Sequence, residues 1–270
     1  MKRRQLLRYF SSSAIAATAI GVNSSWQSWV AQTSSNSLTI QWLGHTCFLF
    51  TSNGTRILTN PFRPLGCTAG YSLPDVQADL VLVSSFLLDE GAVEDLSGNP
   101  RILTQPGDYQ VNKIKFQGIS IPHDREGGRR FGNNIAWRWT QGGINILHLG
   151  GAAAPIGIEQ KILMGSPDVL CVPVGGGAKA YNPQEALQAI DVLKPKLVIP
   201  TQYLTAAADR SSCDLVSVDE FLALTQDMNI RRLDSDAITI SPQDLEQEGT
   251  LIRVFDKDSE FVGQNYHFHA

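Results

Sequence analysis

Short apolar runs alternate with turn-forming residues along most of the chain, and their spacing predicts a strand-rich fold. Residues 38–50 (L-T-I-Q-W-L-G-H-T-C-F-L-F) and 56–62 (R-I-L-T-N-P-F) flank S-N-G-T, whose Asn-Gly pair is typical of a hairpin turn. Residues 78–85 (A-D-L-V-L-V-S-S) form an apolar run expected of a strand buried on both faces. Further apolar runs follow at residues 143–151, 168–177 and 196–205.

Two segments in the second half carry helix-start signals. Asn182 precedes Pro183 and an acidic Glu185, which predicts an N-cap, a proline in the first turn and a capping box. Ser217 begins a second helix by the same logic. Residues 231–233, 237–240 and 251–255 are predicted closing strands. Together the elements predict an α/β fold in which two sheets pack face to face with helices outside.

The N-terminus has the pattern of an export signal. Arg3-Arg4 is followed by Leu6-Leu7 and a mildly apolar stretch at residues 14–22, which is typical of the twin-arginine route. The stretch is shorter than the ~20 apolar residues that span a bilayer. We therefore expect a signal peptide and polar linker over residues 1–37, one domain over 38–256 and a tail over 257–270. The predicted location is the periplasm or, in a photosynthetic cell, the thylakoid lumen.

Removal of the signal makes the chain more acidic. The four basic residues of that segment leave, so 22 basic residues fall to 18 against 26 acidic ones, a formal charge of about −8. This balance argues against nucleic acid as a partner. The rest of the chain shows no integral membrane segment, and its size is sufficient for one well-buried domain.

The order of these motifs resembles a known enzyme family. The V-P-V-G-G-G turn at residues 172–177 and the I-P-T-Q-Y-L-T segment at 199–205 are its more specific parts. From residue 38 to 255 the chain is similar to the metallo-β-lactamase superfamily, in particular to its predicted zinc-dependent hydrolase branch with ascorbate-phosphate lactonase-like proteins. The resemblance implies a four-layer αβ/βα sandwich.

The resemblance also locates a metal site whose ligands have changed. In that family His-x-His-x-Asp-His follows a buried strand and helps to hold two metal ions. Residues 85–90 (S-F-L-L-D-E) occupy that position here. Asp89 matches the family aspartate. Ser85, Leu87 and Glu90 replace the three histidines.

The remaining ligand positions differ in the same way. His148 matches a family histidine, but Gly151 and Gln202 replace a family aspartate and histidine, and Asn60 replaces the aspartate of a D-P turn. Only Asp89 and His148 keep the family residue, and in the family these two serve different metals. We therefore expect no tightly held cofactor, with zinc or another divalent metal bound weakly at most.

Other family-like features lie at the rim of the cleft. Gly44-His45 resembles the Gly-His pair that related sequences carry after their first strand, and His123 opens H-D-R-E-G-G-R-R-F-G-N-N. Arg125, Arg129 and Arg130 in this loop have the planar fork that suits carboxylate or phosphate recognition. The alternative is a solvated glycine-rich loop with surface arginines.

The cysteines carry no metal or redox motif. Cys47 and Cys171 lie in apolar strands and are predicted core residues. Cys67 and Cys213 lie in loop-like stretches, where a disulfide between them is one option and two free thiols the other. His267 and His269 form a terminal pair typical of a tail.

These observations lead to two hypotheses. The first is an exported protein with a degenerate dinuclear site that acts by binding a protein or small ligand, in assembly, scaffolding or sensing. The second is a hydrolase of a small ester, lactone or phosphoester with a remodelled, mononuclear metal site.

Overall fold

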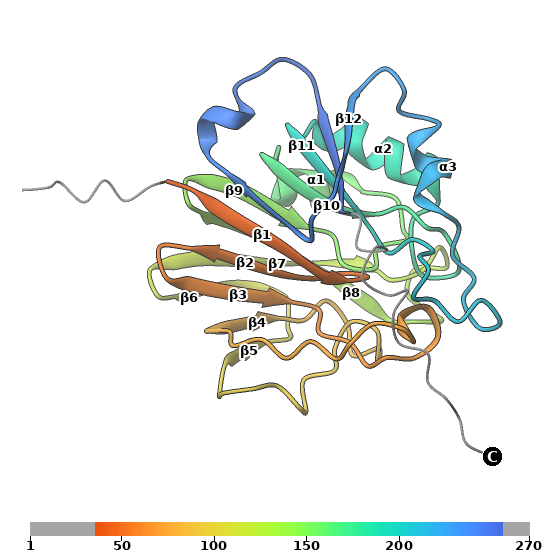
Figure 1. Cartoon of the computed structure of the whole chain (residues 1–270), viewed down its shortest axis with the longest axis horizontal. Helices are drawn as coiled ribbons and strands as arrows, with labels where there is room; N and C mark the ends of the chain where they lie inside the picture. The colour runs from red at the N-terminus through yellow and green to blue at the C-terminus, as the bar shows by residue number, and fades with distance from the viewer. Residues whose placement is uncertain (1–35, 256–270) are drawn as a thin grey trace, which may run out of the picture. The chain divides into compact units, whose positions relative to one another are not determined.

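Two β-sheets packed face to face form the framework of the protein in a computed structural model that describes residues 36–255 (Figure 1). The six-stranded sheet has the order β13-β1-β2-β3-β4-β5, and the eight-stranded sheet has the order β12-β14-β11-β10-β9-β8-β7-β6. The first sheet contains β1 (Leu38–Gly44), β2 (Cys47–Ser52), β3 (Thr55–Thr59), β4 (Leu80–Leu82), β5 (Arg101–Leu103) and β13 (Ala237–Ile240). The second contains β6 (Gly107–Val111), β7 (Ile114–Pro122), β8 (Asn133–Gln141), β9 (Ile144–His148), β10 (Val169–Pro173), β11 (Leu197–Thr201), β12 (Asn229–Leu233) and β14 (Leu251–Phe255). The α/β two-sheet fold predicted from the sequence is confirmed.

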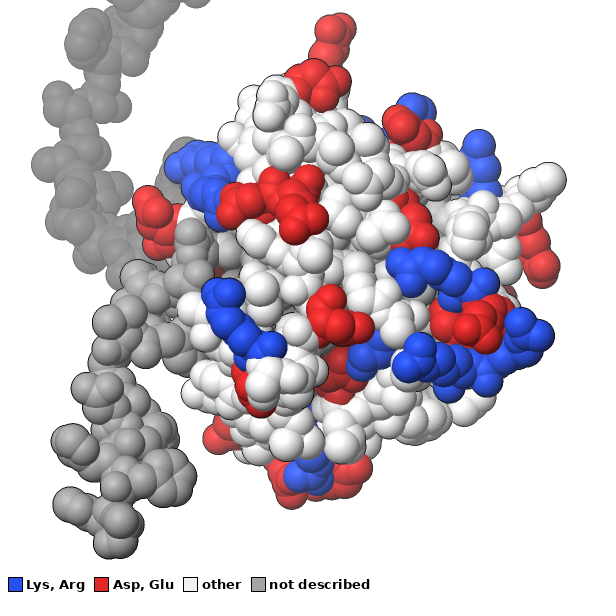
Figure 2. Space-filling model, turned by 90° about the vertical axis from the view of Figure 1, so that its right-hand side faces the viewer, with Lys and Arg blue, Asp and Glu red and all other residues white. Residues whose placement is uncertain are grey.

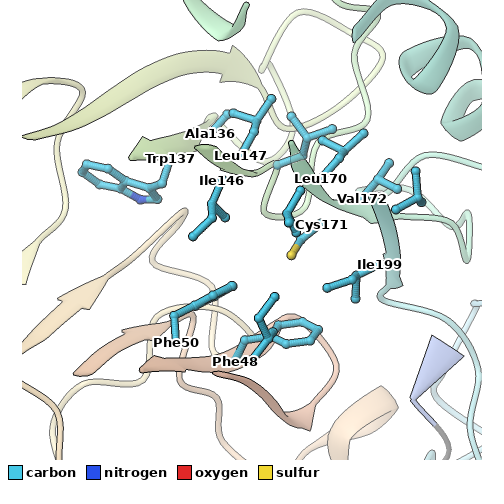
Figure 3. Packing of buried hydrophobic residues seen from close by; sticks show 14 of the residues in the cluster. Phe48, Phe50, Ala136, Trp137, Ile146, Leu147, Leu170, Cys171, Val172 and Ile199 are labelled. Atoms are coloured by element: carbon cyan, nitrogen blue, oxygen red, sulfur yellow. The ribbon is translucent and has the colours of Figure 1, made fainter. Parts of the chain in front are cut away.

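The core lies between the sheets and continues beneath the helices. Ile146 and Cys171 point toward Phe48 and Phe50 of the opposite sheet, whereas Leu170 points away from them (Figure 3). Both faces of β9, β10 and β11 are therefore buried, which explains why these segments are continuously apolar rather than alternating. Strands β9, β10, β11, β14 and β12 run parallel, so their carboxyl ends meet at one edge.

Three short α-helices lie along the eight-stranded sheet (Figure 1): α1 (Ile158–Met164), α2 (Pro183–Leu193) and α3 (Val218–Leu222). The predicted cap of α2 is present, because Oδ1 of Asn182 accepts from Glu185 N at 2.9 Å and Oε2 of Glu185 accepts from Asn182 N at 2.8 Å. Ser217 caps α3. Two 3-10 turns, η1 (Gly66–Thr68) and η2 (Pro242–Leu245), complete the helical elements of residues 36–255. On the six-stranded sheet, loop residues such as Val93 and Leu96 pack against the core in place of a helix.

The first predicted strand is two strands. The chain reverses direction at His45-Thr46, so that β1 pairs antiparallel with β2. Gly44 has φ +120°, and a Cβ there would lie 2.8 Å from the ring of Tyr71. His45 follows in the left-handed region at φ 54°. Gly44, His45 and Thr46 interrupt the apolar residues of this segment. The turn that they form brings His45 to the edge where the parallel strands end.

A disulfide joins two loops at the same edge. Cys67 is bonded to Cys213 across 146 positions of sequence. Backbone bonds from Asp209 N to Gly66 O (2.9 Å) and from Gly70 N to Ala207 O (2.6 Å) flank the bridge. Cys47 and Cys171 are buried free thiols, as predicted.

The predicted signal peptide and the tail with His267 and His269 lie outside the described residues. Among the described helices, none is long and apolar enough to cross a membrane.

Candidate functional site

The sequence-predicted cleft residues meet where strands of both sheets end. Most of them follow or close a strand, whereas Glu90 lies in a turn of the loop after β4, and each is almost completely buried. They are His45, Asn60, Ser85, Glu90, His123, His148 and Gln202. Direct contacts link several of them; for example, Gln202 N lies 3.5 Å from the carbonyl oxygen of His45 and donates to it. Asn60 also contacts the neighbouring strand end, where its Oδ1 accepts from Ser84 N at 2.9 Å. The strand ends thus build a polar interior in an otherwise apolar fold.

Glu90 is the centre of one cluster within this interior. Its Oε2 accepts a hydrogen bond from Ser85 Oγ at 2.9 Å and lies 3.2 Å from Nε2 of His123. Burial opposes charge on both groups, but their mutual attraction outweighs it. It lowers the pKa of the Glu90 carboxyl and raises the pKa of His123. Both directions favour an ionised carboxylate beside a protonated imidazole.

Gly151 makes room for that pair. A Cβ on Gly151 would lie 2.1 Å from Glu90 Oε1 and 2.5 Å from His123 Cε1. The resemblance expects an aspartate ligand at this position. Glu90 and His123 fill the space that its side chain would need, so the two replacements fit together sterically.

Asp89 belongs to a second charged cluster. Its Oδ2 contacts Nζ of Lys179 and lies 3.5 Å from Nε2 of His45. Burial would raise the pKa of the Asp89 carboxyl, but His45 and Lys179 together hold it well below its ordinary value. Sequence reasoning missed Lys179. The only available signal was its place just after the glycine turn that the resemblance puts beside the site.

His148 has no ring nitrogen left for a metal. Its Nδ1 accepts from Gly150 N at 3.0 Å, so the proton lies on Nε2, which is 3.1 Å from the carbonyl oxygen of Thr46 and donates to it. Burial lowers the pKa of this imidazole to about 4, which keeps it neutral. His148 therefore links the β1–β2 turn to the end of β9.

Several buried polar atoms at these strand ends have no hydrogen-bond partner among residues 36–255. They include His45 Nε2, Thr46 Oγ1, Asn60 Nδ2, Ser84 Oγ, Glu90 Oε1, His123 Nδ1, Thr201 Oγ1 and both amide atoms of Gln202. Unpaired buried polar groups are costly, and native proteins satisfy them with water or a polar ligand. Their concentration here gives the strand ends unused hydrogen-bonding capacity.

Two sets of polar contacts hold the loop from His123 to Arg130. One is made by Asp124 and the other by Arg125. The Asp124 carboxylate accepts four backbone N–H groups, from Glu126, Gly128, Arg130 and Phe131, at 2.8–2.9 Å. These bonds outweigh the effect of burial and lower the pKa of Asp124 to about 2.

The guanidinium of Arg125 is committed to contacts within the protein. It donates to both carboxylate oxygens of Glu185 and to the carbonyls of Gly177 and Ala180. Arg125 therefore fastens the loop to α2, and its donors are not directed at an external anion. Arg129 is 79% exposed beside Glu126, and Arg130 lies over the ring of Phe131. Acidic and basic side chains are interspersed on the face drawn in Figure 2.

The rim of the site exposes large apolar side chains. Phe86 is 69% exposed and Leu88 is 51% exposed, although both lie in the loop between β4 and Glu90. Leu88 is next to Arg63 in space, because its carbonyl accepts from Arg63 N at 2.7 Å.

A separate groove lies away from the strand ends, on the β6–β8 part of the eight-stranded sheet. Its volume is about 640 Å³, and Asp108, Tyr109, Gln110, Lys115, Phe116, Gln117, Arg138, Trp139 and Thr140 line it. None of the cleft residues contributes to it. Its lining offers no cluster of catalytic or metal-ligating groups.

Comparison with known proteins defines the family. The model described as "Beta-lactamase superfamily domain" matches residues 39–202, more than half of the chain. The chain belongs to the β-lactamase superfamily. A protein named UPF0173 metal-dependent hydrolase TTHA1283, from Thermus thermophilus, is 28% identical over 189 residues, covering 62% of this chain and 84% of that protein. One from Thermococcus onnurineus is 27% identical over 191 residues, with 62% and 84% covered.

A solved superfamily structure supports the same assignment. A proposed Zn-dependent hydrolase from Thermotoga maritima is 30% identical, with a TM-score of 0.65, and the match covers 81% of this chain and 98% of that one. The hydrolase Igni18 from Ignicoccus hospitalis, at 15% identity and a TM-score of 0.57 over 76% and 99% of the two chains, shares the fold.

The residues of this superfamily member do not fit a dinuclear metal centre. Both ring nitrogens of His148 hold backbone groups, Asp89 is paired with Lys179, and Leu87 has no ligand atom. Glu90 occupies the space of the aspartate that Gly151 replaces. Within residues 36–255, no three His, Cys, Asp or Glu side chains are grouped as metal ligands. Imidazole and carboxylate groups are present, but most of them already form hydrogen bonds or ion pairs with other groups of the protein.

Proposed function

We propose that this superfamily member is an exported binding protein that acts without metal-dependent hydrolysis. The observation that carries the proposal is the engagement of the former ligand atoms by the protein. Asp89 and Glu90 each have an internal cation, and His148 is bonded on both sides to backbone. A metal ion would have to displace these partners, which lowers its effective affinity.

The proposed binding surface is the rim formed by the loops of residues 84–90 and 123–130. The Glu90–His123 pair joins these two loops. The rim exposes Phe86 and Leu88 together with Arg129 and Arg130. Aromatic, aliphatic and arginine side chains are typical of the centres of protein interfaces, and exposed large apolar groups mark such surfaces.

Two features support export. Arg3-Arg4 precedes Leu6-Leu7 in the pattern of a twin-arginine signal. The Cys67–Cys213 disulfide suits an oxidising compartment such as the periplasm, and is rare in the cytosol. The thylakoid lumen of a photosynthetic cell remains the other candidate location.

A hydrolase of a small ester, lactone or phosphoester is the second candidate. Its support is the name metal-dependent hydrolase carried by relatives and the set of unpaired polar atoms at the strand ends, which suits a polar substrate. This alternative needs His45, Asp89 or His123 to release a present partner and bind one metal.

A capture experiment with matched variants tests the binding role. The full chain is expressed with an affinity tag, and partners are captured from the exported fraction. Phe86→Ser with Leu88→Ser should reduce the captured partner about tenfold, as expected when interface anchors are removed. Ile158→Ser with Ile162→Ser is the control, because these side chains on α1 are 83% and 73% exposed.

The same preparations are assayed with lactones, esters and phosphoesters, with and without added zinc. The binding role predicts no zinc-dependent turnover and a capture that only the rim variant loses. Zinc-dependent hydrolysis, or equal capture by both variants, would support the hydrolase instead.

A further inference from the structure

Lys179 is held firmly in the position from which it reaches Asp89. Its neighbours in the loop after β10 are fixed on both sides. Ala178 N donates to Asp214 Oδ2 at 3.2 Å, and the carbonyls of Gly177 and Ala180 each accept from Arg125 at 2.9 Å. The loop therefore presents the Lys179 side chain to Asp89 without relying on that contact alone.

The lysine is the cation closest to a carboxylate that matches a family metal ligand. Nζ of Lys179 contacts Oδ2 of Asp89, and the Asp89 side chain is only 17% exposed. Nε2 of His45 lies 3.5 Å from the same oxygen and has no closer polar partner among residues 36–255. A compact ammonium is a point charge with three donors, so it can occupy the place of a small ion beside a carboxylate.

We propose that Lys179 supplies the positive charge that a metal ion would supply beside Asp89, so that shortening Lys179 converts Asp89 and His45 into a divalent-cation site. The inference rests on the proposed metal-independent function. Its physical basis is that removing one partner of a mostly buried ion pair leaves an uncompensated charge. A divalent cation from solution can then restore neutrality, with Nε2 of His45, which already faces Asp89, as a second ligand.

The neighbouring cluster explains why one site rather than two is expected. Glu90 is neutralised by His123, and Gly151 provides no ligand atom. The Lys179→Ala change removes a nearby positive charge that acts on Glu90 and His123, but it removes none of the direct contacts between them. The new site should therefore bind one cation per chain.

The test is a thermal-unfolding series on the full chain. Wild type should melt at the same temperature with zinc or with a chelator. Lys179→Ala should melt roughly 5 °C lower in chelator, in the range expected for losing one such pair, and zinc should restore most of the loss. Lys179→Arg, which keeps the charge, should show no zinc response. Calorimetric titration of Lys179→Ala with zinc should give one site.

Two controls connect the response to this carboxylate. Lys196→Ala breaks a lysine–aspartate pair elsewhere, between Lys196 Nζ and Asp168 Oδ1 at 2.9 Å, and should show no zinc recovery. Adding Asp89→Asn to Lys179→Ala should abolish the recovery. If Lys179→Ala is too unstable to purify, Lys179→Gln preserves most of the side-chain length and gives the same readout.

The outcomes separate the two proposals. A Lys179→Ala protein that ignores zinc, as Lys196→Ala should, overturns the inference about Lys179. A wild-type protein that retains two zinc ions overturns the proposed function itself.

Discussion

Individual replacements at the strand ends are coupled to one another. Glu90 and Gly151 both depart from the family ligands. The two replacements are sterically dependent on each other, because a side chain at 151 would collide with the Glu90 carboxylate. His148 keeps the family residue, yet its tautomer is fixed by Gly150 N and Thr46 O. Retention of a ligand residue is therefore no sign of retained metal chemistry.

A substitution at Gly151 should expose this coupling. Gly151→Ala places a methyl group against Glu90 and should lower the free energy of unfolding by roughly 1–3 kcal/mol, the usual cost of overpacking. Gly157→Ala is the matched control, because its Cβ would meet only the flexible end of Gln160, at 2.7 Å. Urea titration measures both. Equal, small effects of the two variants would mean that Glu90 can move aside at no cost.

At the level of elements, local sequence signals predicted the helices and strands better than they predicted the turns and the contacts of loops. The capping box of α2 and the apolar runs of β4, β9, β10 and β11 are visible in the sequence because their causes are local. The β1–β2 turn was not predicted, because Gly44-His45-Thr46 contains none of the common hairpin dipeptides and His45 takes a positive φ that its residue type does not signal. The hydrogen-bond partner of Arg125 also could not be predicted from the sequence, since Glu185 lies 60 positions away.

Arg125 should therefore act on stability. Arg125→Ala removes four hydrogen bonds between the 123–130 loop, the glycine turn and α2. We expect a loss of roughly 1–2 kcal/mol, because the site is partly solvated and screening reduces the ionic contribution. Arg129→Ala, at an exposed pair, should change stability by less than about 0.5 kcal/mol. Chemical denaturation compares them, and similar losses would refute a specific role for Arg125.

At the level of the whole molecule, the resemblance predicted the fold and the set of residues at the edge, but not how they pair. Lys179 and Asp89 are 90 positions apart, and no local pattern joins them. The disulfide was one of two options for the same reason, since spacing does not determine whether Cys67 and Cys213 meet. Contacts between loops that are far apart in the sequence could be identified only in the structure.

The disulfide should contribute strongly to stability. Cys67→Ser with Cys213→Ser opens a loop closed across 146 positions. Chain-entropy estimates give a loss of roughly 2–5 kcal/mol. Thiol titration of the denatured exported protein should find two free thiols before reduction and four after it. Four thiols before reduction would show that the bridge does not form in the compartment of the protein.

Zinc content tests the central claim most directly. The purified full chain is incubated with excess zinc, dialysed against a mild chelator and analysed for metal per chain. Because Lys179 and His123 already neutralise Asp89 and Glu90, well under one zinc per chain should remain. Two retained zinc ions per chain would contradict the claim and restore the dinuclear hydrolase.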